Sequence, residues 1–420
     1  MQRLMKNIGW LLTGRGLNAV LSLVYLALAT RTLGLDGFGY FAIIVALGQT
    51  VTGIANFQTW QFIVRWGSAE DGPAEATGFA IALDAISVVF GSLLTIVLVG
   101  TAQLWLPLPD ELLPLTFAYC MVSLLAIRST PTGLLRLRFK YALATAADAV
   151  QPIVRATGAV LAFYYMPSVT GFILAWAASE VAVAAAYWIV AARQERIDTS
   201  RISLRRIPAD HPDAWRFVLS TNLSGSLLVA GKQVMILLVG AIGGEAFAGG
   251  FRVASQLGQA LVQLAQTVSK AIYPELVHAK DEAHAMARRM ANIALIGGVL
   301  AVAFAVLFGR WGLEAIAGEE FGIVYWAMVI LAISGAIEMV GASLESLLVS
   351  AGNAGTAFIV RAIPTLFAFV MLDTAMEWNG LKGAAFAVMG ASAMSVIGFW
   401  VAILSLQQIR ITIEDPPAKS

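Results

Sequence analysis

A regular line of polar side chains between residues 252 and 270 is the feature of this sequence that most clearly suggests a binding surface. Counted from the first member, the others follow at offsets of 4, 7, 11, 14 and 18 residues, which places all of them on one face of a helix. At a rise of about 1.5 Å per residue, the line is about 27 Å long. Its members are Arg252, Gln256, Gln259, Gln263, Gln266 and Lys270.

The composition indicates the surroundings of such a helix. Hydrophobic residues make up 59% of the 420 residues, charged residues make up 13%, and the mean hydropathy is +0.79. These values lie far outside the usual range of soluble domains. The chain is therefore predicted to be an integral membrane protein.

Apolar segments long enough to cross a bilayer, which takes about 20 residues each, recur along the whole chain. They predict an all-α fold with about twelve transmembrane helices. The predicted spans are approximately 7–30, 40–63, 78–99, 112–127, 144–166, 171–191, 217–239, 247–272, 291–308, 323–349, 356–372 and 381–404.

An internal repeat organises these spans. The segment 33–49 returns in blurred form at 242–259, half a chain length later, with Gly34 matching Gly243, Phe38 matching Phe247 and the triplet 47–49 matching 257–259. Six spans separate the two copies, so both copies cross the membrane in the same sense. Two six-helix lobes related by a parallel pseudo-twofold repeat are predicted, an architecture typical of secondary transporters.

The repeat predicts four parts of the chain. Residues 1–192 form an N-terminal six-helix lobe, 193–216 a basic cytoplasmic linker, 217–406 a C-terminal six-helix lobe and 407–420 a cytoplasmic tail. Lys and Arg gather in the segments that this topology places inside, whereas the predicted outer loops hold only Arg31, Arg310 and Lys382 as bases. Both termini are therefore expected in the cytoplasm.

Lipid does not tolerate a polar face that crosses the hydrocarbon core, so the line at 252–270 must contact other helices, water or a ligand. Hydrogen bonds between helices are one explanation, since Gln often joins membrane helices. A water-filled path is the other, and six polar residues in an unbroken line favour it. The second span carries a weaker version of this face, with Gln49 and Asn56 at the positions equivalent to Gln259 and Gln266.

The distribution of charge adds a second indication of a cavity. Spans 7–30, 40–63, 217–239 and 247–272 contain Arg15, Lys232 and Arg252 but no Asp or Glu, and Asn18 lies on the same helix face as Arg15. A cation in the membrane interior is costly. A net positive cavity that binds an anion, such as a phosphate or pyrophosphate, is one explanation. The alternative is that these side chains reach the interface, because each lies within about eight residues of a span boundary.

Acidic residues lie in the other spans, where we expect mainly structural roles. Glu345 and Arg361 are predicted to form an ion pair between neighbouring helices, and Asp148, Gln151 and Arg155 share one helix face. Glu338 and Glu345 also share a face, which makes them the candidates for coupling to a proton or a sodium ion. The other acidic residues in spans are Asp84 and Glu180.

Other chemistry has little support. The three His residues lie in predicted cytoplasmic loops without the spacing of metal ligands, and no nucleotide-binding motif is present. A single Cys120 excludes an intramolecular disulfide. We expect no catalytic residues, no metal, no cofactor and no nucleic-acid partner, and therefore no enzyme.

Several short motifs resemble a known family of membrane proteins. They are Arg31-Thr32-Leu33-Gly34, Phe38-Gly39-Tyr40, Phe251-Arg252-Val253-Ala254-Ser255 and Tyr273-Pro274-Glu275. With the length, span count and repeat, they resemble the polysaccharide transporters of the multidrug/oligosaccharidyl-lipid/polysaccharide exporter superfamily, the Wzx-type flippases for O-antigen and exopolysaccharide. Lys232 departs from relatives that often have an acidic residue near this point, which puts ion coupling in doubt.

The resemblance implies a flippase in the bacterial inner membrane that moves undecaprenyl-pyrophosphate-linked oligosaccharide to the outer leaflet through a cationic central cavity. Its partners would be that substrate, membrane lipids and other polysaccharide-assembly proteins. One alternative is a multidrug or organic-cation antiporter of the same superfamily, which the lack of acids in the four cavity-lining spans disfavours. A membrane polymerase or ligase acting on lipid-linked sugars is another, which the short outer loops disfavour.

Overall fold

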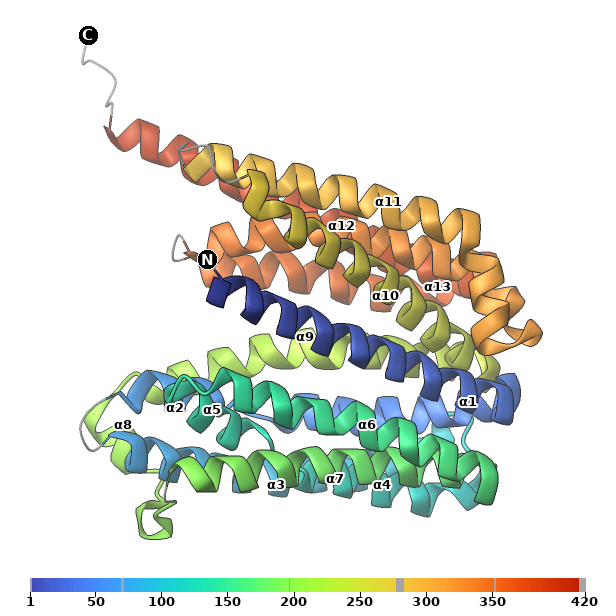
Figure 1. Cartoon of the computed structure of the whole chain (residues 1–420), viewed down its shortest axis with the longest axis horizontal. Coiled ribbons are helices and arrows are strands. Elements are labelled where there is room, and N and C mark those ends of the chain that lie inside the picture. Colours follow the sequence, from blue (N-terminus) through green and yellow to red (C-terminus); the bar gives the residue numbers. More distant parts are fainter. Residues whose placement is uncertain (1, 69–71, 196, 277–282, 351–352, 415–420) are drawn as a thin grey trace. The chain divides into compact units, whose positions relative to one another are not determined.

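The structure is a computed structural model that describes residues 2–68, 72–195, 197–276, 283–350 and 353–414. It is built from helices, and the described residues contain no β-strand. The long helices are α1 (Gln2–Ala55), α3 (Gly72–Gly100), α4 (Leu113–Leu125), α6 (Tyr141–Tyr165), α7 (Val169–Gln194), α9 (Ala214–Gly243), α10 (Glu245–Leu276), α11 (Ala283–Ala317), α12 (Tyr325–Ser350) and α13 (Ala354–Glu414) (Figure 1).

Shorter helices join these elements. They are α2 (Trp60–Trp66), α5 (Ser129–Leu137) and α8 (Arg206–Asp210), together with the single 3-10 turns η1 (Ala102–Leu104), η2 (Asp110–Leu112), η3 (Thr199–Arg201) and η4 (Glu319–Val324).

Two of the long helices each contain a sharp break at glycine. Gly34 divides α1 with φ 65° and ψ −171°, and Asn379 and Gly380 divide α13, where φ of Gly380 is 53°. A positive φ is strained for other residues but open to glycine. Once these breaks are counted, eleven of the twelve predicted spans each match one long helix, whereas 40–63 covers the end of α1, a break at 56–59 and the start of α2. The all-α prediction is confirmed for the described residues.

Apolar side chains cover outward-facing surfaces of these helices, as a protein in lipid requires. On α3, for example, Val89, Leu93, Ile96 and Val97 are all more than half exposed. Seven segments in the described part of the chain are long and apolar enough to cross a membrane, and two of them, Val20–Trp66 and Gly355–Ser405, include the breaks at Gly34 and Gly380. The chain is therefore a multi-pass membrane protein.

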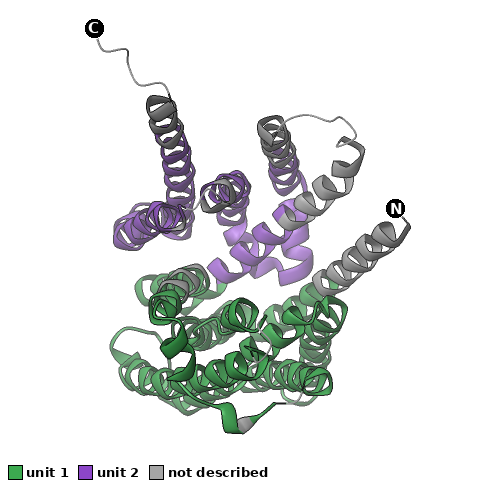
Figure 2. Cartoon of the chain, turned by 90° about the vertical axis from the view of Figure 1, so that its left-hand side faces the viewer, with its two compact units in different colours: residues 1–249 green, residues 250–420 purple. Residues whose placement is uncertain are grey.

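The chain divides into two compact units, residues 1–249 and 250–420 (Figure 2). The first contains α1 to α9 and the first residues of α10. Within it, the segment after α7 packs onto the helices, because Ile207 of α8 is buried in a cluster with Phe62, Phe79 and Val218. Ion pairs from Arg201 and Arg206 to Glu75 hold the same segment to α3. The boundaries 192/193 and 216/217 stay a prediction.

The turns of the sequence repeat have matching geometry. Gly244, with φ 88° and ψ 177°, adopts nearly the conformation of Gly34, one position beyond the residue that the sequence alignment pairs with it. The aligned glycines Gly39 and Gly249 also touch, since an added Cβ at Gly249 would lie 2.9 Å from the Gly39 nitrogen. Both copies of the motif thus use glycine to turn the chain and to allow close packing of backbones.

Candidate functional site

Two helix breaks lie side by side in the first unit. Helix α1 ends at Ala55 and α2 starts at Trp60, with Gln58 between them at φ 54°. Helix α4 ends at Leu125 and α5 starts at Ser129. The breaks are joined by a hydrogen bond of 3.1 Å from the Trp60 amide to the Ser129 hydroxyl. Close packing of α5 on α2 requires Gly133, where an added Cβ would lie 2.8 Å from the Trp60 Cα.

Side chains from neighbouring helices satisfy the polar groups that the breaks release. Asp84 of α3 is 5% exposed and accepts hydrogen bonds from Thr59, which precedes α2, and from Thr130 at the start of α5. From α9, the amide of Asn222 donates to the carbonyl oxygen of Asn56 at 3.0 Å. A buried carboxylate or carbonyl is costly unless it is hydrogen bonded. These contacts therefore hold both breaks in place.

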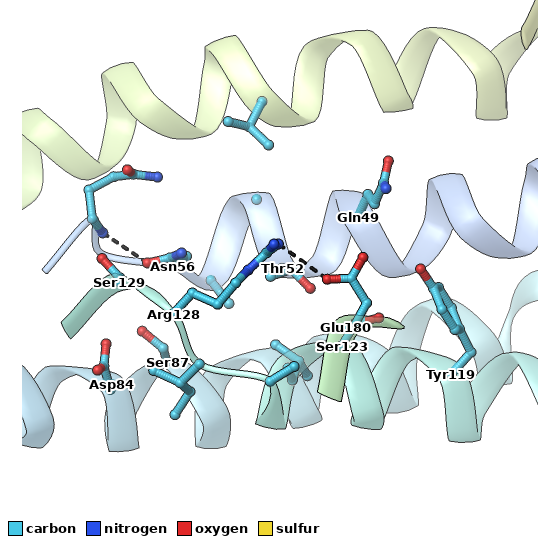
Figure 3. A pocket seen from close by; sticks show the side chains of 17 residues that line it. Gln49, Thr52, Asn56, Asp84, Ser87, Tyr119, Ser123, Arg128, Ser129 and Glu180 are labelled. Carbon is cyan, nitrogen blue, oxygen red and sulfur yellow. Dashed lines mark hydrogen bonds and ion pairs between the residues drawn. The ribbon is translucent and has the colours of Figure 1, made fainter. Parts of the chain in front are cut away.

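The breaks open onto a pocket of about 370 Å³, which we call the break pocket (Figure 3). Helix α1 contributes Gln49 and Thr52, α3 contributes Ser87, and α4 contributes Tyr119 and Ser123. The complete lining is Gln49, Thr52, Gly53, Ala55, Asn56, Gln58, Asp84, Ser87, Tyr119, Ser123, Leu124, Ala126, Ile127, Arg128, Ser129, Glu180 and Val229. Most of these side chains are polar, which is unusual within a membrane domain.

An ion-pair network forms one wall of the break pocket. The carboxylate of Glu180 on α7 forms ion pairs with the guanidinium groups of Arg128 and of Arg155 on α6, each at 3.2 Å. It also accepts a hydrogen bond of 2.8 Å from the side-chain amide of Gln151. Figure 3 shows Arg128 and Glu180 pointing toward one another. The guanidinium of Arg155 lies 3.6 Å from the centroid of the Trp176 ring. This network fixes Glu180 with both oxygens occupied.

Of the residues that the sequence assigns to a binding cavity, the structure brings two into the break pocket, Gln49 and Asn56. Lys232 is exposed on α9. On α10, Arg252 is 8% exposed, while Gln256 and Gln259 are half-buried. The remaining four assigned side chains, Arg15, Asn18, Gln263 and Gln266, lie outside the described residues.

The two candidates for ion coupling have partners on other helices. Glu338 of α12 accepts a hydrogen bond of 3.2 Å from Ser392 of α13. Glu345 forms an ion pair with Arg361, which confirms the pairing expected from the sequence. Asp148 accepts a hydrogen bond of 2.7 Å from Tyr187, and among the described residues Arg155, not Asp148, is the residue of α6 that takes part in an ion pair.

Sequence reasoning missed most of the break pocket. Arg128 directly follows the predicted span 112–127, so the sequence places it in a loop, and Ser87 and Ser123 resemble any small residues in apolar spans. One signal was available: the run Ser129-Thr130-Pro131 is typical of a helix start and marks a second helix after α4. Nothing comparable marks Gln58, whose positive φ depends on contacts distant in the sequence.

Known proteins place the chain in a family. The family described as "Polysaccharide biosynthesis protein" matches residues 4–280. Inner membrane protein YghQ of Escherichia coli (strain K12) is 29% identical over 284 residues, which cover 65% of this chain and 80% of YghQ.

Solved structures share the fold at low identity. The lipid II flippase MurJ, in an inward closed conformation, gives a TM-score of 0.70 at 12% identity over 93% of this chain and 86% of MurJ. The MATE transporter VcmN of Vibrio cholerae gives a TM-score of 0.62 at 14% identity over 97% of this chain and 98% of VcmN. At these identities, the flippase and the transporter show that this chain shares their fold. The chain belongs to the polysaccharide biosynthesis protein family.

Proposed function

We propose that this protein is a flippase that moves lipid-linked oligosaccharide, of the undecaprenyl-pyrophosphate type, from the cytoplasmic to the outer leaflet of the bacterial inner membrane. The product would serve the synthesis of cell-surface polysaccharide. The observation that carries the proposal is a match to a polysaccharide biosynthesis family in a chain whose fold resembles that of a lipid II flippase. Movement by alternating access fits the transporter fold and the parallel repeat.

The anionic head group needs cationic partners, and Arg15, Lys232 and Arg252 are the candidates. Arg252 has the strongest support, because a side chain that is 8% exposed does not reach out to the lipid interface. The planar guanidinium binds two phosphate oxygens at once. The polar face that follows on α10, with Gln256 and Gln259, would line the route of the sugars.

An organic-cation antiporter is the competing function within this fold. Such a transporter needs a carboxylate that is available to the cation. In the break pocket, the oxygens of Asp84 are hydrogen bonded by two threonines and those of Glu180 are taken by Arg128, Arg155 and Gln151. We therefore favour the lipid-linked substrate.

The charge assignment can be tested in cells that depend on this protein for surface polysaccharide. Arg252→Ala and Lys232→Ala are each expected to lower the polymer about tenfold or more, because a hydrogen bond to a charged group contributes about 1.5–3 kcal/mol. Arg310→Ala is the matched control, since Arg310 is 73% exposed and pairs with Glu314 on its own helix. Immunoblots of membranes would establish that the variants insert. Normal polymer in both Arg252→Ala and Lys232→Ala would refute the assignment.

The same proposal implies an orientation of the chain in the membrane and a set of partner enzymes. Both termini would lie in the cytoplasm, which protease or thiol-labelling accessibility of terminal tags can measure. Enzymes that assemble and polymerise the polysaccharide would act before and after this protein.

A further inference from the structure

Two serine hydroxyls face the break pocket without a hydrogen-bond partner among the described residues. Ser87 of α3 and Ser123 of α4 are 8% and 9% exposed, and both line the pocket. Serine in a membrane helix normally donates to a carbonyl of the preceding turn, as Ser92 does to Val88 at 2.7 Å. Buried hydroxyls that lack this bond are costly and indicate a ligand that supplies the missing partner.

Amide side chains offer further unused hydrogen-bonding groups. The Asn56 side-chain oxygen accepts from the Gln58 amide at 3.0 Å, and the Gln58 side-chain oxygen accepts from Trp60 at 3.2 Å. Among the described residues, neither NH₂ group has a hydrogen-bond partner, so both can donate to a ligand. The whole side-chain amide of Gln49 is unused within the part of the chain that the structure describes. Donors and acceptors thus surround the pocket on several sides.

The charges around the break pocket balance one another. Two acidic residues, Asp84 and Glu180, stand against two basic residues, Arg128 and Arg155. Asp84 is held by Thr59 and Thr130, while Glu180 is held by both arginines. Both arginines are therefore already paired with Glu180 and are not open to a phosphate, and neither carboxylate is open to a cation. The groups that remain open are uncharged hydroxyls and amides.

We propose that the break pocket is a binding site for a neutral saccharide unit. A sugar ring carries hydroxyls that both donate and accept, which matches the open serines and amides. The volume of about 370 Å³ lies at the small end of the range for small-molecule sites, so the pocket accommodates one or two sugar rings and not a long oligosaccharide. The identification of this sugar as part of the transported substrate rests on the proposed function.

Saccharide binding can be measured directly on the full-length protein in lipid nanodiscs. Saturation-transfer NMR with the neutral disaccharides lactose and N,N′-diacetylchitobiose, at millimolar concentration, is expected to give signals from the sugar protons. Ser87→Ala and Ser123→Ala should each weaken binding about threefold to tenfold, and Ser87→Leu, which fills the pocket, should abolish it. Ser92→Ala is the matched control, because the Ser92 hydroxyl already bonds to its own helix. Thermal unfolding of each variant checks that it folds.

Inorganic pyrophosphate serves as the competing probe. Sugar signals that persist with pyrophosphate present and vanish in Ser87→Leu support the proposal. Absence of sugar signals, equal signals in Ser87→Leu, or displacement of the sugars by pyrophosphate would overturn it. The proposed function can fail separately: a protein that binds saccharide in this pocket but translocates no lipid-linked oligosaccharide refutes the flippase alone, and a translocating protein without saccharide binding refutes the pocket alone.

Discussion

The two helical segments that follow the repeated glycine turns, the part of α1 after Gly34 and α10 after Gly244, begin alike and end differently. Gly34 and Gly244 make equivalent turns, and Gly39 and Gly249 pack against each other just beyond them. Then α1 stops at Ala55 and opens the break pocket, whereas α10 continues without interruption to Leu276. The N-terminal copy places its polar groups around a break, whereas in the C-terminal copy Arg252, Gln256 and Gln259 lie on a continuous helix. The repeat has thus preserved the start of the helix and allowed its polar end to diverge.

The divergence depends on support from outside the repeated segment. The break after α1 requires Asp84 and Asn222, together with Ser129 from the second break. A continuous helix needs no such support, because its backbone groups bond to one another. If this comparison is correct, substitutions at the supporting residues should harm the first unit far more than similar substitutions in the second.

The largest effect is expected for Asp84→Ala. This change removes the carboxylate that accepts hydrogen bonds from the buried hydroxyls of Thr59 and Thr130, and a buried donor left without its acceptor costs about 1–3 kcal/mol for each group. Unfolding of the purified protein by SDS titration would measure the loss. Asp198→Ala, at an exposed site in the segment between α7 and α9, is the control. Equal stability of the two variants would show that Asp84 does not hold the breaks.

A second contrast compares the ion pairs of Glu180 in the first unit with the Glu345–Arg361 ion pair in the second. Glu180→Gln should destabilise by about 3 kcal/mol, since Glu180 is 8% exposed at its side chain and its loss leaves Arg155, which is 15% exposed, facing an uncharged amide. Glu345→Gln should cost at most about 1 kcal/mol, because Glu345 and Arg361 are 30% and 26% exposed at their side chains. The same SDS titration applies. A larger loss for Glu345→Gln would reverse the comparison.

The shared start of the two copies can be tested with alanine. Gly39→Ala should cost about 1–3 kcal/mol, because the new Cβ would collide with the backbone of Glu245. Gly37→Ala, where the nearest atom is the Cβ of Leu33 at 3.2 Å, should be tolerated. Thermal unfolding of both variants would measure this difference. Equal melting temperatures would show that the contact between the copies contributes little.

The smallest effect is expected for substitution by glycine, which should raise stability in the first copy and lower it in the second. Gln58→Gly should stabilise by about 0.5 kcal/mol: glycine removes about 1–2 kcal/mol of strain at the positive φ, and loss of the hydrogen bond from Trp60 offsets about 1 kcal/mol of it. Ala260→Gly, inside the continuous helix α10, should destabilise by about 1 kcal/mol. Differential scanning fluorimetry is sensitive enough to give the sign of each change. A loss of stability in Gln58→Gly would contradict the assigned break geometry.

The sequence was sufficient to predict the features that depend on local pattern. Span positions follow from hydropathy, the equivalence of the segments 33–49 and 242–259 follows from the repeat, and the Glu345–Arg361 pair follows from the depth of its members. The break pocket could not be predicted in this way, because its supporting contacts join distant residues, such as Asp84 with Thr130 and Trp60 with Ser129. Charge patterns likewise identified Arg252 as a candidate, whereas the uncharged Ser87 and Ser123 gave no local signal.

The central claim is that this protein moves lipid-linked oligosaccharide across a membrane. The most direct measurement is translocation in proteoliposomes that contain the purified protein and no other component, with a fluorescent lipid-linked oligosaccharide whose outer-leaflet fraction is quenched from outside. The account predicts rapid, protein-dependent exchange between leaflets that Arg252→Ala slows about tenfold or more, with no uptake of organic cations. Exchange no faster than in protein-free liposomes, together with organic-cation uptake, would contradict it.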